Sequence, residues 1–259
     1  MNFLGHIFCT TIGRKFVMAV TGLVLIGFVC GHLVGNLQVF EDPDRINGYA
    51  HFLQSLGPVL WLVRLVLLAC VGLHVWAATA LTLESRAARG GETYQVKTWL
   101  QASVASRYTR WTGYVVLAFI VYHLAHFTVG VAQASTFKEN LPAYTMVGDY
   151  HILGLTVVRA GTRVLDVHSM VILGFQNPLV SGFYILAVAL LSLHLLHGAE
   201  SLFQTFGLRN ARWARGLRAV VTLACAAYLL GNIAIPGSVL VGALAPRAHA
   251  TLASASPNR

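Results

Sequence analysis

Four histidines lie inside otherwise charge-free apolar stretches of the chain, each in a different stretch: His32, His74, His123 and His194. An imidazole is costly in hydrocarbon unless it has a partner, so an ionisable side chain at membrane depth is by default a candidate for function. Four histidines on four helices can supply two axial nitrogens to each of two haem irons. These residues therefore favour electron-transfer chemistry at two bis-histidine haems.

The elements that position these histidines are predicted to be membrane helices. The chain is 56% hydrophobic and only 10% charged, whereas soluble domains carry about 25% charged residues. Crossing a bilayer takes about 20 apolar residues, and the runs are continuous, which excludes the alternating pattern of a barrel. Five stretches qualify: 16–40, 57–83, 111–132, 178–206 and 219–239. We predict an all-α integral membrane domain over 1–243, whose first four helices form a haem-binding bundle, and a disordered tail over 244–259.

The positions of lysine and arginine predict the orientation of the helices. One side holds Arg45, Lys138, Arg159 and Arg163, mixed with Glu41, Asp42, Asp44, Glu139, Asp149 and Asp166. The other side holds Arg14, Lys15, Arg86, Arg89, Lys97, Arg107, Arg110, Arg209, Arg212, Arg215 and Arg218. This bias places the N-terminus in the cytoplasm and the C-terminus outside. The first span is too long for a signal-peptide core and lacks a small-residue cleavage site, so it is expected to be retained.

Depth along the alternating helices sorts the histidines into two pairs. His32 lies nine residues before Glu41 on an outgoing helix, roughly 14 Å below the outer charges, and His123 is also in an outer half. His74 and His194 each lie 16 residues after the proline that starts an ingoing span, roughly 24 Å down. We therefore expect an outer pair, His32 with His123, and an inner pair, His74 with His194.

A short internal repeat agrees with this pairing. Thr21-Gly22 precedes His32 by the same eleven residues that separate Thr112-Gly113 from His123. Eleven residues are about three helical turns, or some 16 Å, so the threonines are expected near the inner haem level. Gly27, Gly31 and Gly35 recur every fourth residue beside His32, a spacing that allows close approach of a helix or of a flat ring.

Several other chemistries are excluded by missing patterns. The four cysteines are far apart and form no CxxC, which argues against a disulfide framework, a cysteine zinc site or an iron–sulfur site. No CxxCH, GxGxxG or Walker A sequence occurs. The net charge of +9 resides in short loops without interleaved aromatics, so it does not indicate nucleic-acid binding.

Polar residues near the ligands are open to two interpretations each. His126 and His197 follow ligand candidates by three residues. They can complete a four-histidine metal site, or they can line the haem pocket and form hydrogen bonds to its propionates. The predicted depths favour the second interpretation. Arg110 can likewise meet a propionate or anchor the chain at the interface. Glu200 can deliver protons to a quinone or pair with Arg209 or an arginine on a neighbouring helix.

Quinone-binding candidates occur on both sides of the predicted membrane. His51, Gln54 and Ser55 belong to the outer connection, and Ser201, Gln204 and Glu200 lie at the inner end of the fourth span. The long outer segment from Gln133 to Asn177 is expected to be functional or to have structure of its own. His151 and His168 within it are expected to be solvated.

Motifs along residues 10–240 resemble the cytochrome b subunit of succinate:quinone oxidoreductases, in its five-helix, di-haem form. The motifs are Arg14-Lys15, Thr21-Gly22, Gly31-His32-Leu33-Val34-Gly35-Asn36-Leu37, Asn47, His51-Phe52, Leu56-Gly57-Pro58, Leu73-His74, Thr112-Gly113, His123-Leu124, Gly174-Phe175-Gln176-Asn177-Pro178 and His194-Leu195-Leu196-His197-Gly198 with Ser201-Leu202-Phe203-Gln204-Thr205-Phe206-Gly207. Glu200 stands where tryptophan is common in the family, and His168 where tyrosine is common in the outer loop.

The resemblance implies the cofactors and partners. It places the axial ligands on His32, His74, His123 and His194, paired first with third and second with fourth. It implies two haems b and a quinone substrate, for which menaquinone is the expected type. It also implies two partner subunits, an iron–sulfur protein and an FAD-containing flavoprotein that oxidises succinate. The implied location is the bacterial cytoplasmic membrane, and electrons would pass from the inner to the outer haem. Fumarate reduction uses the same scaffold.

Two other function classes stay open. One is the di-haem anchor of another quinone-linked enzyme, such as a hydrogenase or formate dehydrogenase, which copurifying soluble subunits would reveal. The other is a metal or ion transporter built on the HxxH pairs. That alternative predicts bound divalent metal, no visible absorbance, and equal importance of His126 and His123.

Overall fold

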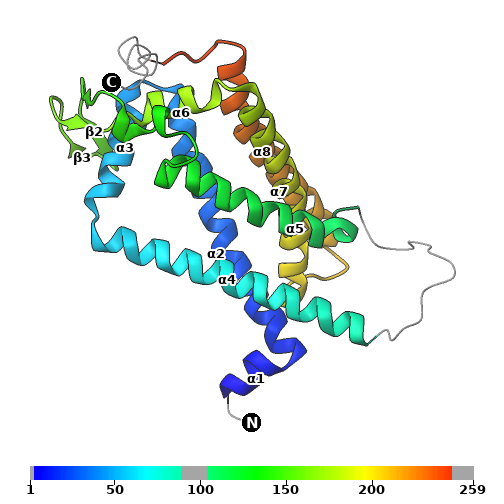
Figure 1. Cartoon of the computed structure of the whole chain (residues 1–259). Coiled ribbons are helices and arrows are strands. Elements are labelled where there is room, and N and C mark those ends of the chain that lie inside the picture. Colours follow the sequence, from blue (N-terminus) through cyan, green and yellow to red (C-terminus); the bar gives the residue numbers. More distant parts are fainter. Residues whose placement is uncertain (1–2, 89–103, 247–259) are drawn as a thin grey trace. The chain divides into compact units, whose positions relative to one another are not determined.

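The computed structural model describes residues 3–88 and 104–246 (Figure 1). Within these ranges, five helices are long and apolar enough to cross a membrane, which confirms the five predicted helical stretches. They are α2 (Thr11–Leu37), α4 (Pro58–Ala87), α5 (Val104–His123), α7 (Pro178–Thr205) and α8 (Ala214–Leu240). Helices α2, α5 and α8 begin five to seven residues earlier than predicted, because helical hydrogen bonding continues through polar residues that hydropathy does not count.

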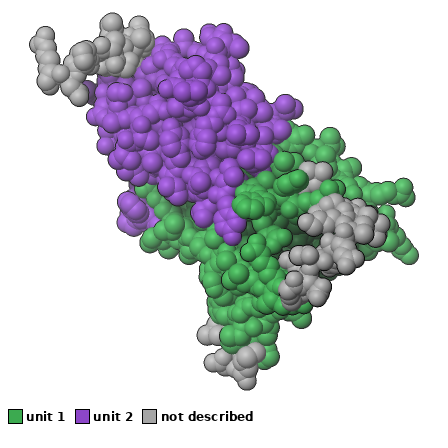
Figure 2. Space-filling model, turned by 45° about the vertical axis from the view of Figure 1, so that its right-hand side comes forward, with its two compact units in different colours: residues 1–30, 62–113, 191–226 green, residues 31–61, 114–190, 227–259 purple. Residues whose placement is uncertain are grey.

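Contacts within the chain separate it into two compact units (Figure 2). Unit 1 comprises residues 1–30, 62–113 and 191–226, and unit 2 comprises residues 31–61, 114–190 and 227–259. Each long helix contributes residues to both units. The predicted single domain over 1–243 stays a prediction. Arg89, Lys97 and the predicted tail from residue 247 onward lie outside the described residues.

Unit 1 begins with a short helix, α1 (Phe3–Cys9), followed at once by α2. The two are joined at Thr10, whose hydroxyl donates to the His6 carbonyl and accepts from the Gly13 amide. A side chain at Gly13 would collide with the backbone of α1, so the close approach of the two helices requires glycine there.

Unit 2 contains the connections that follow α2 and α5, in which further helices and strands form. Helix α3 (Pro43–Ser55) starts with a proline at its first position and is capped by Asp42, which accepts from the Asp44 amide. Two small antiparallel sheets follow later in the chain: β1 (Tyr144–Thr145) pairs with β4 (Arg163–Val164), and β2 (Tyr150–Ile152) pairs with β3 (Leu155–Val158). Their buried side chains form one apolar cluster: Tyr144, Met146, Tyr150, Val158 and Val164.

Helix α6 (Val167–Phe175) is the most deeply buried element of unit 2, since every residue from His168 to Phe175 is buried. It follows three further turns: η2 (Leu124–Val129), a π-helical turn at the end of α5, and the 3₁₀ turns η3 (Ala134–Thr136) and η4 (Lys138–Asn140). A third 3₁₀ turn, η1 (Gln38–Phe40), ends α2. The segment 133–177 thus has the structure of its own that its length predicts.

The expectation that His168 is solvated is wrong. Its side chain is only 6% exposed, and its backbone amide donates to Asn47 Oδ1 at 2.9 Å. The apolar run Val171–Phe175 carries α6 into the interior and takes His168 with it. His151, by contrast, is exposed on β2.

Candidate haem-binding sites

The outer histidines lie together in unit 2. His32 is on α2, and His123 is the last residue of α5. Their ring centroids are 5.7 Å apart with the ring planes perpendicular. His32 is exposed although it lies in an apolar part of a long helix, and His123 is half-buried.

Aromatic side chains surround His123 in unit 2. Phe119, Phe127 and Tyr184 each place a ring centroid 5.7–6.0 Å from that of His123. Directly after His123 the helix changes to the π-helical turn η2, a local geometry that is frequent at functional sites. The turn carries His126 away from the pair and into a buried position beside Tyr184.

The inner histidines lie together in unit 1. His74 is on α4 and His194 on α7, and their ring centroids are 6.3 Å apart. Both side chains are half-buried. The structure therefore assembles the same two pairs that the depth estimate predicts, one in each unit.

The Thr-Gly repeat lies against the inner pair. Thr21 Oγ1 is 3.2 Å from His74 Nδ1, and Thr112 Oγ1 is 3.4 Å from His194 Nδ1. Both threonines are only 5% exposed. The glycine after each threonine faces the same imidazole edge.

The ring separations fit axial ligation. Two imidazole nitrogens, each about 2 Å from a shared metal ion, plus the ring radius on either side, put the ring centres roughly 6 Å apart. Both pairs approach this value without a haem. Among residues 3–88 and 104–246, His, Cys, Asp and Glu side chains form no group of three that could hold a metal ion. The structure brings imidazoles together in two pairs, and a bis-histidine haem takes two imidazole ligands.

Glycines line the histidine-bearing helices in two different ways. At Gly27 and Gly31 of α2, Gly72 of α4 and Gly198 of α7, an added Cβ would meet nothing within 4 Å. Gly35 differs, because a Cβ there would lie 2.6 Å from the Tyr49 ring of α3. The predicted glycine stripe therefore splits into a helix-packing position and positions that leave the helix surface open.

The other candidate pocket residues have more ordinary surroundings. His126 Nδ1 lies 3.0 Å from Tyr184 Oη, and its ring stacks on Phe127 at 3.8 Å. His197 is half-buried in unit 1, and Arg110 is exposed there. His126 and His197 belong to different units.

The quinone candidates also divide between the units. His51, Gln54 and Ser55 lie on α3 in unit 2, where Gln54 and Ser55 are exposed. On α7 in unit 1, Ser201 is half-buried and Gln204 is exposed. Glu200 receives a two-pronged ion pair from Arg218 of α8, at 2.9 and 3.3 Å. Of the two interpretations of Glu200, the ion pair with a neighbouring helix is the one that the structure contains.

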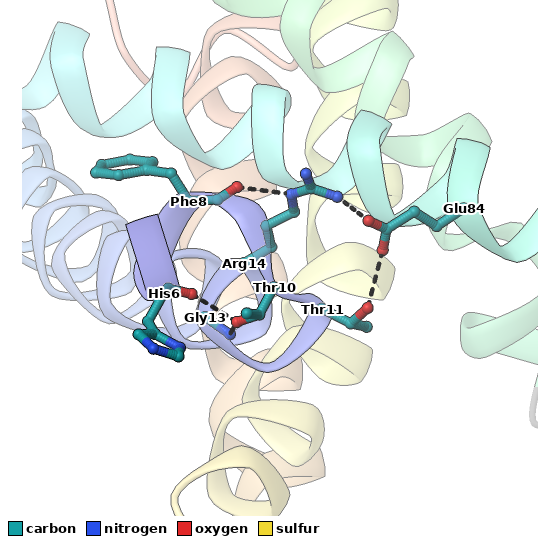
Figure 3. Close-up of polar contacts among 7 residues, drawn as sticks. All are labelled: His6, Phe8, Thr10, Thr11, Gly13, Arg14 and Glu84. Atoms are coloured by element: carbon teal, nitrogen blue, oxygen red, sulfur yellow. Dashed lines mark hydrogen bonds and ion pairs between the residues drawn. The ribbon is translucent and has the colours of Figure 1, made fainter. Parts of the chain in front are cut away.

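Two polar clusters were missed by the sequence analysis. In unit 1, Arg14 of α2 forms an ion pair with Glu84 of α4, whose other oxygen accepts from Thr11 (Figure 3). The Arg14 Nε also donates to the Phe8 carbonyl. The sequence signal for this ion pair was that Arg14 and Glu84 carry opposite charges at the predicted cytoplasmic ends of consecutive antiparallel spans.

The second missed cluster holds α3 to α6 in unit 2. Asp166 and Asn47 are almost fully buried, at 1% and 0% exposure. Asp166 Oδ1 accepts from the Ser169 amide at 3.0 Å and lies 3.5 Å from Asn47 Nδ2. An N-cap pattern of aspartate three residues before serine was the signal for the start of α6.

Comparison of the chain with protein-family models, curated proteins and solved structures finds no match. The functional argument therefore depends on the residues and their geometry.

Proposed function

We propose that this chain is a di-haem cytochrome b that serves as the membrane anchor of a succinate:quinone oxidoreductase. The observation that carries the proposal is the assembly of two histidine pairs, His32 with His123 and His74 with His194, at ring separations of 5.7 and 6.3 Å. An imidazole is costly in hydrocarbon unless it has a partner, so we expect histidines that meet pairwise from four apolar helices to share one.

The residues of the chain would hold and orient the cofactors. In this proposal the four histidines supply axial nitrogens, and the open glycine positions on α2, α4 and α7 leave room for flat rings. A bound haem b supplies reversible one-electron chemistry at its iron. The protein's part is to hold the ligand nitrogens in place, exclude water with apolar helices and set the electrostatic environment.

The proposed partners supply the chemistry that this chain lacks. An FAD-containing flavoprotein oxidises succinate, an iron–sulfur subunit delivers the electrons, and a quinone, proposed to be menaquinone, accepts them. We place the chain in a bacterial cytoplasmic membrane. These assignments depend on the family resemblance of the sequence motifs.

Visible spectroscopy tests the proposal directly. The purified complex is reduced with dithionite, its difference spectrum is recorded, and haem is quantified as the pyridine haemochrome. We expect two b-type haems per chain, and one per chain in each of His32→Ala and His74→Ala. His151→Ala, which changes an exposed histidine of β2, is the matched control and should keep both.

The anchor role needs a separate readout. Addition of succinate to the native complex should reduce the haem absorbance, and a flavoprotein and an iron–sulfur subunit should copurify. Haem that is reduced by formate or hydrogen instead would reassign the chain to another quinone-linked enzyme. Absence of haem together with bound divalent metal would reject the cytochrome and favour the transporter.

A further inference from the structure

Two buried threonine hydroxyls contact the inner histidines at the same ring nitrogen. Thr21 Oγ1 is 3.2 Å from Nδ1 of His74, and Thr112 Oγ1 is 3.4 Å from Nδ1 of His194. The threonines are on α2 and α5 and the histidines on α4 and α7, so each contact joins two helices within unit 1.

The direction of these hydrogen bonds follows from the other contacts of the hydroxyls. Thr21 Oγ1 donates to the Val17 carbonyl at 2.8 Å, and Thr112 Oγ1 donates to the Thr109 carbonyl at 3.0 Å. A hydroxyl has one hydrogen to donate, and its lone pairs can only accept. With that hydrogen used by a backbone carbonyl, the oxygen accepts from the imidazole, and Nδ1 must carry the hydrogen.

For His194, a backbone carbonyl gives the same answer independently. The Thr109 carbonyl oxygen lies 3.2 Å from His194 Nδ1, and at the other site the Met18 carbonyl oxygen lies 3.2 Å from Thr21 Oγ1. A carbonyl oxygen has no hydrogen and can only accept. Met18 and Thr109 each precede a threonine of the repeat by three residues, so the two sites have matching construction.

Glycine beside each threonine lets the imidazole come this close. A Cβ built on Gly22 would lie 3.4 Å from Cε1 of His74, and one on Gly113 would lie 3.3 Å from Cε1 of His194. The threonine sets the hydrogen bond and the glycine sets the position of the ring edge, which is a reason for the two residues to occur together in both halves of the chain.

We propose that Thr21 and Thr112 are positioning residues that hold His74 and His194 as the Nδ1–H tautomer, leaving both Nε2 lone pairs free to bind a metal. The consequence of this tautomer for a bound haem rests on the proposed function. When the threonine oxygen accepts a hydrogen bond from Nδ1–H, the imidazole becomes a stronger electron donor and its plane is fixed. Ferric haem is then favoured over ferrous haem at the inner site, so loss of the bond should raise that haem's reduction potential.

The test compares Thr→Val with Thr→Ser in the haem-loaded complex. Thr21→Val and Thr112→Val remove the hydroxyl at nearly constant volume, whereas Thr21→Ser and Thr112→Ser keep it. Ser192→Ala is the matched control, because it removes a buried hydroxyl of α7 that has no hydrogen-bond partner among the described residues. The readouts are haem content, the midpoint potential of each haem, and the low-temperature electron paramagnetic resonance of each ferric haem.

The expected result is specific to one haem. Both valine variants should raise the potential and change the resonance of the haem that His74→Ala removes, or lose that haem, while the haem removed by His32→Ala stays as in the native complex. Serine variants and Ser192→Ala should keep native values. Two bound haems with unchanged potentials and spectra in both valine variants would overturn the inference and leave the proposed function standing.

A second measurement does not depend on haem. Nitrogen-15 resonance of the histidine-labelled, haem-free chain distinguishes a protonated Nδ1 from a protonated Nε2. We expect His74 and His194 to carry the hydrogen on Nδ1, with assignments from His74→Ala and His194→Ala. A hydrogen on Nε2 would overturn the inference, even if the native protein proves to bind no haem or if the valine variants fail to reach the membrane.

Discussion

At the scale of single residues, the histidines differ in what their ring nitrogens contact. Nδ1 of each inner histidine contacts a threonine hydroxyl, and Nδ1 of His194 also contacts a carbonyl. Nδ1 of His126 contacts Tyr184 instead, and its ring stacks on Phe127. The distinction separates histidines that face a second histidine from histidines that pack into the protein. It predicts that the two kinds respond differently to substitution.

Removing histidines two at a time tests the pairing. His32→Ala with His123→Ala removes both ligands of one haem, so the double variant should keep one haem per chain. His32→Ala with His74→Ala removes one ligand from each pair and should leave none. Pyridine haemochrome quantitation measures both. Equal haem content in the two double variants would contradict the pairing.

Tyr184→Phe tests the role of His126. The change leaves a buried imidazole nitrogen without its 3.0 Å partner, which costs about 1–3 kcal/mol of stability. Haem content should stay at the native value. Tyr122→Phe removes a hydroxyl from the same aromatic cluster and is the control for thermal unfolding in detergent. A loss of haem in Tyr184→Phe with native stability would place His126 in the haem pocket.

At the scale of elements, ion pairs join neighbouring helices at their polar ends. Arg14 of α2 pairs with Glu84 of α4, at 20% and 37% side-chain exposure, and Arg218 of α8 pairs with Glu200 of α7. Both pairs lie in unit 1. Because water reaches the Arg14–Glu84 pair only partly, this pair is expected to contribute more than a fully exposed pair.

Glu84→Gln should loosen α4 from α2. The substitution replaces the charged acceptor of Arg14 and Thr11 (Figure 3), with an expected loss of about 1–3 kcal/mol. A double-mutant cycle with Arg14→Gln isolates the pairwise part. The exposed pair Arg45–Glu41 is the comparison, where the same cycle should give about 0–1 kcal/mol. Equal coupling energies in the two cycles would contradict the prediction.

The start of α3 is tied to the outer loop by Asp44, and this tie should depend on pH. Its carboxylate accepts from the Val147 and Gly148 amides. Burial raises the pKa of Asp44, but hydrogen bonds from Val147, Tyr144 and Gly148 outweigh it, so the pKa lies below the usual value.

An acid whose pKa is lower in the folded than in the unfolded chain stabilises the folded chain while it is ionised. This contribution is complete above the pKa of the unfolded chain and is lost as the pH falls through the pKa of the folded chain. We therefore expect proteolysis of the segment 144–165 to accelerate below about pH 4 in the native chain. Asp44→Asn should be cleaved faster at neutral pH and show less dependence on pH. A variant with the native pH profile would show that another group controls the loop.

At the scale of the whole molecule, five long apolar helices alternate with loops of unequal charge. The acidic residues Glu41, Asp42, Asp44, Glu139, Asp149 and Asp166 occur in the connections after α2 and α5. Arginines dominate the turn between α7 and α8 instead. The chain should therefore insert with that turn in the cytoplasm and with the strands outside.

Cysteine labelling tests this orientation. Leu153→Cys places a thiol at the tip of the β2–β3 hairpin, where the side chain is 99% exposed. In intact cells it should react with a membrane-impermeant maleimide. Asn210→Cys, in the exposed turn between α7 and α8, should react only after the membrane is opened. The reverse pattern would invert the topology.

Local properties of the chain were enough to predict the five helices and which histidines lie together. That these four histidines are haem ligands stays a prediction. Hydropathy and a rise of about 1.5 Å per residue depend only on neighbours in sequence, and they also placed Thr21 and Thr112 at the level of the inner histidines. The alternative interpretations of Glu200 already included a partner on a neighbouring helix.

Contacts between distant residues were decided by the tertiary structure alone. His168 lies beside Asn47, 121 positions away, and Thr21 lies against His74, 53 positions away. Depth along a helix follows from the number of residues, but the direction in which a side chain faces depends on how each helix is rotated and packed against the others. The burial of α6, the Arg14–Glu84 pair and the hydrogen on Nδ1 of the inner histidines all follow from that packing.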